Sequence, residues 1–97
     1  MSMTQQYLAG ELSLRLAQLQ ELAADDAARS SASLLRHQAE TAALPELASI
    51  ARRAIELVDA LCWKSVTHGD VTAFSKQSAT AAELYEFSVC AGLLRER

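Results

Sequence analysis

The chain contains almost no residues that would interrupt a helix. Its 97 residues include one proline and three glycines, while alanine and leucine, which are strong helix formers, are abundant. Apolar residues also recur at spacings of three and four, which is the spacing of one helical face. These two features predict an all-α chain, and the length favours a single helical domain over residues 1–97.

The first predicted helix covers residues 3–24 and ends before the next apolar stripe begins. Extending it further would place Asp26 and Ser30 on its apolar face, so we expect a break near residues 25–31. Asp and Ser are also good N-cap residues for a following helix. The apolar face of this first helix consists of Leu8, Leu12, Leu16, Leu19 and Ala23.

Proline, glycine and aspartate mark the remaining helix boundaries. Pro45 fits the first turn of a helix, where its missing N–H costs little. Gly69 suits a helix C-terminus, and Asp70 suits the N-cap of the helix that follows. Three further helices are therefore expected, at residues 27–43, 45–67 and 70–94.

Four helices joined by short loops favour antiparallel neighbours, so the expected fold is a small antiparallel four-helix bundle. The alternative has three long helices with a kinked first arm, completed by dimerisation. Helical spacing predicts that the fourth helix turns one face inward. That face consists of Val71, Phe74, Ser78, Ala81, Leu84, Tyr85, Ser88, Val89 and Gly92.

The charge pattern argues against several classes of partner. The net charge is −3, and the one basic doublet, at residues 52–53, has Glu46 and Glu56 on either side. Because no basic patch is visible, we expect no direct nucleic-acid binding. No apolar run approaches the ~18 residues of a membrane span, and the N-terminus has no signal-peptide pattern. We expect a cytoplasmic protein with no membrane partner, and its alanine and arginine content hints at a high-GC bacterial genome.

Catalytic and metal-binding signatures are not found in the sequence. It has no Glu-x-x-His, His-Glu-x-x-His or paired Cys-x-x-Cys motif, so we expect no metal, no cofactor and no enzymatic activity. His68 and Asp70 are interpreted as residues at helix ends. In an antiparallel hairpin Cys62 and Cys90 would be roughly 20 Å apart along the helices, which is too far for a disulfide.

Several apolar residues lie outside the expected core stripes. Trp63 falls about 160° around its helix from Leu47, among charged residues, at 100° per residue. Three interpretations are open: a tryptophan lying flat near a helix end, a contact with another chain, or a ligand contact. The candidate interface residues are Trp63, Tyr7, Leu14, Phe87, Ala91 and Leu94.

These observations favour a non-enzymatic helical bundle that acts through protein–protein association, as a regulator, adaptor or small chaperone. A homodimer is the expected assembly, because two-fold dimers are the commonest closed oligomers. One alternative is a small-molecule-binding bundle with an internal cavity near Tyr85. Another is an accessory subunit of an enzyme or of a DNA-binding complex.

Overall fold

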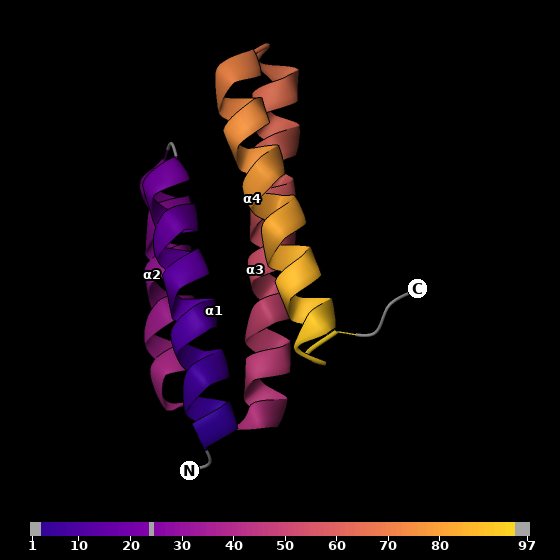
Figure 1. Ribbon diagram of the computed structural model, residues 1–97. Coiled ribbons are helices and arrows are strands. Elements are labelled where there is room, and N and C mark those ends of the chain that lie inside the picture. The colour runs from indigo at the N-terminus through magenta and orange to yellow at the C-terminus, as the bar shows by residue number, and fades with distance from the viewer. Residues whose placement is uncertain (1–2, 24, 95–97) are drawn as a thin grey trace.

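The computed structural model describes residues 3–23 and 25–94, and within them it contains four α-helices and no strand. Figure 1 shows the helices in chain order: α1 (Met3–Leu22), α2 (Asp26–Thr41), α3 (Leu44–Thr67) and α4 (Val71–Cys90). Each helix begins within one residue of its expected start. The expectation of an all-α four-helix bundle is confirmed.

The helices are arranged as two antiparallel hairpins that pack against each other. Helix α1 pairs with α2, and α3 pairs with α4; within the described residues α2 and α4 do not touch. The α3/α4 hairpin is the longer one, and its turn extends beyond the turn that joins α1 and α2 (Figure 1). The molecule is therefore elongated and flat, measuring 44 × 29 × 15 Å.

Two aspartates start helices as their positions in the sequence predict. Asp25 Oδ1 accepts a hydrogen bond from the Ala28 amide at 2.7 Å and caps α2. Asp70 Oδ1 accepts one from the Ala73 amide at 3.0 Å and caps α4. Because the chain stops and restarts at Asp25, α1 and α2 fold back on each other, and the kinked first arm is not adopted.

The ends of α1, α2 and α4 differ from the prediction, and α2 ends at Thr41 where residue 43 was expected. Helix α1 ends at Leu22, and the predicted last residue, Ala24, lies outside the described residues. The expected end of α4 is residue 94, but the helix ends at Cys90, because Gly92 adopts a left-handed φ of 76°. The Leu93 amide then donates to the Ser88 carbonyl at 2.8 Å, which is the bond of a Schellman motif.

The core lies between the two hairpins and is built mainly from α1, α2 and α3. The predicted leucine face of α1 is buried, and it packs on small alanines of α2 and on a long stripe of α3. Small residues on α2 allow its backbone to approach α1 closely. The fully buried large side chains are Leu12, Leu16, Leu19, Leu47, Val58, Leu84 and Ser88.

The prediction of the inner face of α4 is wrong for several residues. Phe74, Tyr85 and Val71 are exposed, whereas Gln77 is 2% exposed. Two contacts explain this rotation of the helix. Gln77 Oε1 accepts a hydrogen bond from the Ser65 hydroxyl at 2.6 Å, and on the α1 side the Arg15 guanidinium stacks 4.2 Å from the centroid of the ring of Phe87.

Candidate association surface

The outer side of α3 carries a row of exposed residues that continues for three helical turns. Arg52, Glu56, Asp59 and Trp63 are spaced by four, three and four residues, so they lie on one face. All four are exposed, and 74% of the surface of Trp63 is accessible to solvent. The prediction that Trp63 lies outside the core is confirmed.

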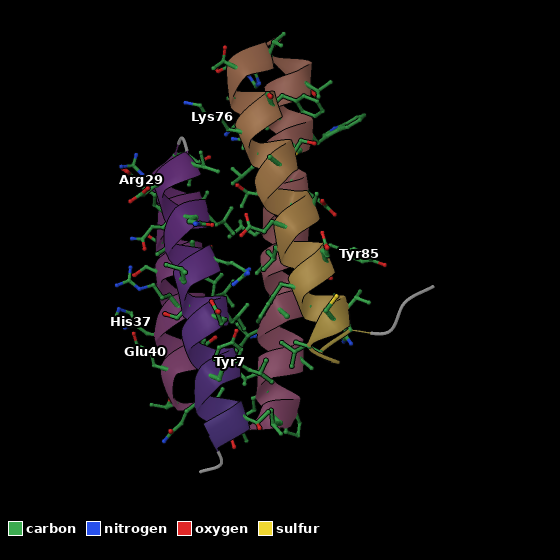
Figure 2. The ribbon with its side chains drawn as sticks, viewed as in Figure 1. Tyr7, Arg29, His37, Glu40, Lys76 and Tyr85 are labelled. Carbon is green, nitrogen blue, oxygen red and sulfur yellow. The ribbon has the colours of Figure 1, made fainter. Side chains whose placement is uncertain are left out.

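A matching row runs along the outer side of α4. Phe74, Ser78, Ala81 and Tyr85 repeat the same spacing of four, three and four. Phe74 is 37% exposed and Tyr85 is 43% exposed. Figure 2 shows Tyr85 pointing away from the α1/α2 hairpin. Two aromatic side chains of α4 are therefore partly exposed to solvent, whereas Ala81 between them packs against the core.

A groove of about 830 Å³ separates these two rows at the end of the hairpin away from its turn. The left-handed turn at Gly92 reverses the chain and brings Leu93 and Leu94 across the end of the groove. Tyr85 forms part of the α4 wall. The lining residues are Arg52, Ile55, Glu56, Asp59, Tyr85, Gly92, Leu93 and Leu94.

The tip of the α3/α4 hairpin adds further exposed apolar residues. The last contacts with the first hairpin are made near Lys64, whose Nζ lies 3.0 Å from Asp25 Oδ2, and Gln77, whose Nε2 donates to the Leu22 carbonyl at 3.5 Å. Beyond this level only two helices remain, and they cannot enclose their apolar residues. Val66 and Val71 are exposed there. We call the two rows, the groove and this tip the outer α3/α4 surface.

The charged side chains of this surface are not paired with one another. Arg52 and Glu56 are four residues apart on α3, yet within the described residues no ion pair joins them, and none involves Asp59. The basic residue lies nearer the start of α3, and the two acidic residues lie nearer its end. Along this row one basic residue is therefore followed by two acidic residues.

The six predicted interface residues divide among three locations. Trp63 belongs to the outer α3/α4 surface, and the half-buried Leu94 lines its groove. Tyr7 and Leu14 are exposed on α1, in the other hairpin. The remaining two, Phe87 and Ala91, pack against the core and do not form the outward line that was expected.

Val71, Phe74 and Tyr85 were not predicted as surface residues, because helical spacing places them on the inner face of α4. The groove was not predicted either, because it depends on the early end of α4 before Gly92. The signal for that end was present in the sequence, since a glycine near the end of a helix commonly stops it.

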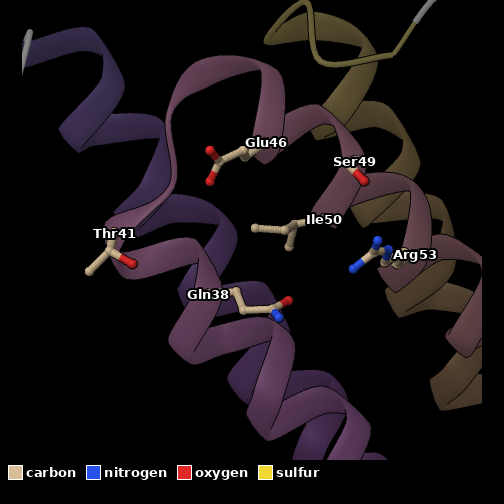
Figure 3. Close-up of a pocket in the computed structure, with 6 residues that line it drawn as sticks. All are labelled: Gln38, Thr41, Glu46, Ser49, Ile50 and Arg53. Carbon is tan, nitrogen blue, oxygen red and sulfur yellow. The ribbon is translucent and has the colours of Figure 1, made fainter.

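A second hollow lies between α2 and the start of α3 and has a volume of about 260 Å³ (Figure 3). Its lining is largely polar and includes Gln38, Glu46 and Arg53, all of which are exposed. Ile50 is its one buried side chain. Ligand sites are normally enclosed and mainly apolar, so this shallow, solvated hollow lacks the features of such a site.

Within the described residues no three His, Cys, Asp or Glu side chains are placed to hold a metal ion. Cys62 and Cys90 are free thiols; burial, and secondarily the charge of Asp59, raises the pKa of Cys62. A raised pKa lowers the thiolate fraction at neutral pH. No described helix has the length and apolar character required to cross a bilayer.

Comparisons with known proteins do not assign a family to the chain. No protein-family model matches it, and neither the search of curated proteins nor that of solved structures produced a match. Any functional interpretation therefore depends on the surface of the molecule.

Proposed function

We propose that the chain is a non-enzymatic helical-bundle protein that acts through protein–protein association as a regulator, adaptor or small chaperone, with a second copy of itself as its partner. The observation that supports this most is the position of Trp63, which is exposed and takes no part in the core. Tryptophan and tyrosine are enriched among the residues that dominate binding energy at interfaces.

The surroundings of Trp63 also support association. The exposed residues Phe74, Tyr85 and Val66 lie on the same hairpin, and the groove that Tyr85 lines is partly apolar. Monomeric proteins rarely expose large contiguous apolar patches, and such patches commonly mark interaction sites. A second copy that covered the outer α3/α4 surface would remove these aromatic side chains from water.

A small-molecule site is the weaker proposal for the same groove. The predicted internal cavity near Tyr85 is instead an open groove, and exposed charged side chains form much of its α3 wall. Small-molecule pockets usually bury 70–90% of their ligand. A broad protein surface matches an open groove of this kind better than a small ligand does.

Light scattering coupled to size-exclusion chromatography tests the proposal. We expect a dimer at high micromolar concentration, and we expect Trp63→Ala to weaken it by roughly 30-fold, the equivalent of an interface residue worth about 2 kcal/mol. Leu14→Ala is the matched control, because it removes an exposed apolar side chain from the other hairpin.

The same variants should keep their fold. Neither side chain belongs to the core, so the free energy of unfolding at a concentration below dimerisation should change by less than about 0.5 kcal/mol. A wild-type chain that stays monomeric at high micromolar concentration contradicts the homodimer. Equal dimerisation of Trp63→Ala and wild type contradicts the role of this surface.

A further inference from the structure

We infer that two copies pair face to face through the outer α3/α4 surface, with their α3 helices antiparallel and Arg52 of each copy opposite Asp59 of the other. This inference rests on the proposed self-association and specifies its geometry. It follows from the order of charges along α3 and from the position of Trp63 relative to the groove.

Arg52 and Asp59 of α3 are complementary to each other only in the antiparallel orientation. Both residues line the groove, and they lie at equal distances from a point between Ile55 and Glu56. A two-fold axis through that point places each Arg52 opposite the Asp59 of the other copy, and it brings the two copies of Glu56 close to the axis, each within one helical turn of the other Arg52. A parallel pairing would bring Arg52 against Arg52 and Asp59 against Asp59, which is unfavourable.

The same axis places Trp63 of one copy beside the end of the groove of the other. Trp63 lies four residues after Asp59, so it faces the position four residues before Arg52, which is Ala48. Ser65 is level with Gln77, to which it is hydrogen-bonded. By that register Cys90, the last residue of α4, is level with Arg52, so Ala48 lies about one helical turn beyond the end of α4. The exposed tryptophan would therefore lie beside the turn that follows α4 of its partner, where Leu94 is half-buried and lines the groove.

Tyr85 lies close to this axis. By the same register, the midpoint between Ile55 and Glu56 is level with residues 86–87 of α4. Tyr85 is within two residues of that level and points outward (Figure 2). The two copies of Tyr85 would come together near the axis, where aromatic rings pair favourably in offset or edge-to-face arrangements.

The full extent of the surface reaches the lower limit for a stable dimer. Helix α3 has 24 residues and α4 has 20, which correspond to about 36 Å and about 30 Å, and each packed helix is about 9 Å wide. The outer face therefore covers roughly 600 Å² per copy, or about 1,200 Å² in total. Specific interfaces begin at about 1,200 Å² in total.

Charge reversal at two positions tests the orientation. Arg52→Glu places a carboxylate opposite Asp59, and Asp59→Arg places a guanidinium opposite Arg52, so each variant alone creates two repulsive pairs per dimer. We expect each to weaken dimerisation by about tenfold or more in analytical ultracentrifugation at ~50 mM salt, where screening is limited. Glu40→Arg, an exposed charge reversal on α2, should leave dimerisation within about twofold.

Mixing the two weakened variants is the decisive measurement. An equimolar mixture of Arg52→Glu and Asp59→Arg forms two attractive pairs in the heterodimer, so association should return to within about threefold of wild type. The double variant carrying both changes should recover in the same way. Circular dichroism should show the same helix content for all of these variants, because both positions are exposed.

The outcomes separate this inference from the proposed function. If the wild type dimerises but mixing gives no recovery, or the single reversals have no effect, the antiparallel pairing is wrong while self-association stands. If the wild type is monomeric at high micromolar concentration, a different partner covers the surface, and both the homodimer and this inference fail.

Discussion

The two hairpins use their apolar residues differently. In the α1/α2 hairpin, leucines of α1 pack on alanines of α2, and the outer side of α2 carries polar side chains such as Arg29, His37 and Glu40, which point away from the bundle in Figure 2. In the α3/α4 hairpin, α3 buries a stripe of residues that runs from Leu47 to Ser65, whereas α4 buries three residues. The first hairpin also exposes Tyr7, Leu14 and Leu34, but the second hairpin exposes more large apolar side chains, among them Trp63, Phe74 and Tyr85.

The difference arises from helix length and from the residues on the uncovered side of each outer helix. Helices α3 and α4 have 24 and 20 residues, compared with 20 and 16 for α1 and α2. Four extra residues extend each helix by about 6 Å. Helices α2 and α4 each contact two other helices within the described residues, but the uncovered side of α2 is mainly polar, whereas that of α4 carries Phe74 and Tyr85. When a helix carries apolar residues on two sides and neighbours cover only one side, the apolar residues on the other side remain exposed.

The largest expected effect comes from removing the main apolar anchor of α4. Leu84 is 1% exposed and is the one large apolar side chain fully buried in this helix. Leu84→Ala should lower the free energy of unfolding by about 3 kcal/mol, as is typical of a buried Leu→Ala change. Urea denaturation followed by circular dichroism at low protein concentration measures this.

Tyr85→Ala is the control, because this neighbour lies on the exposed side of the same helix. Its cost should be below about 1 kcal/mol. Similar costs for Leu84→Ala and Tyr85→Ala would mean that both sides of α4 are packed, and the contrast between the hairpins would disappear.

The next effect concerns the polar pair that orients α4. Gln77→Leu removes the acceptor of the buried Ser65 hydroxyl and the donor to the Leu22 carbonyl. An unsatisfied buried polar group costs about 1–3 kcal/mol, so we expect a loss of about 2 kcal/mol in the free energy of unfolding. Gln38→Leu, at an exposed position on α2, should change it by less than about 0.5 kcal/mol.

The double variant Ser65→Ala with Gln77→Leu should recover part of this loss, since no buried hydroxyl is then left without a partner. A double-mutant cycle measures the coupling. Additive costs of the two changes would show that Ser65 and Gln77 do not act as a pair.

This polar pair also explains what the sequence did not predict about α4. Two faces of α4 have helical spacing and contain apolar residues. One is the outer row from Phe74 to Tyr85, and the other is the inner face that includes Gln77, Leu84, Ser88 and Ala91. Periodicity alone favours the more apolar row for the interior, yet the observed interior row contains Gln77. Its partner Ser65 lies on another helix, so a calculation of phase along one helix cannot detect the pairing. The helix starts were predictable because the proline and the capping aspartates act locally.

The candidate surface was predictable to a similar degree. Helix α3 has one unambiguous apolar stripe, so Trp63 could be assigned to its outer side from sequence. Tyr85 and the groove depend on the rotation of α4 and on the turn at Gly92, which are set by tertiary contacts. Single-helix patterns therefore located one wall of the groove but not the other.

A smaller effect distinguishes two glycines, one in each hairpin. Gly10 lies within α1, where an added Cβ would meet no atom within 4 Å, so Gly10→Ala should stabilise the protein by roughly 0.5–1 kcal/mol. Gly69 has a φ of 71° in the α3/α4 turn, so Gly69→Ala should destabilise it by about 1 kcal/mol. Thermal unfolding should show shifts of opposite sign, and shifts of equal sign would contradict the assigned backbone conformations.

The smallest expected effect is a pH dependence at the junction of the two hairpins. The amide of Ala28, and then the ammonium group of Lys64, lower the pKa of Asp25 below its ordinary value. Because the folded pKa is depressed, this stabilisation is present above about pH 4 and is lost as the pH falls through the folded pKa. Urea unfolding midpoints measured from about pH 6 to about pH 2 should show it as a loss on acidification.

Two variants separate the causes of that shift. Asp25→Asn keeps a side chain that can cap α2 but cannot titrate, so its stability should fall less steeply with acidification than that of wild type. Lys64→Met removes only the contribution from the second hairpin, and because the Ala28 amide is the larger cause, most of the pH dependence should remain. If Lys64→Met flattened the profile as fully as Asp25→Asn, the ion pair between the hairpins would be the main cause, and the hairpins would be more strongly coupled at this end than the helix cap implies.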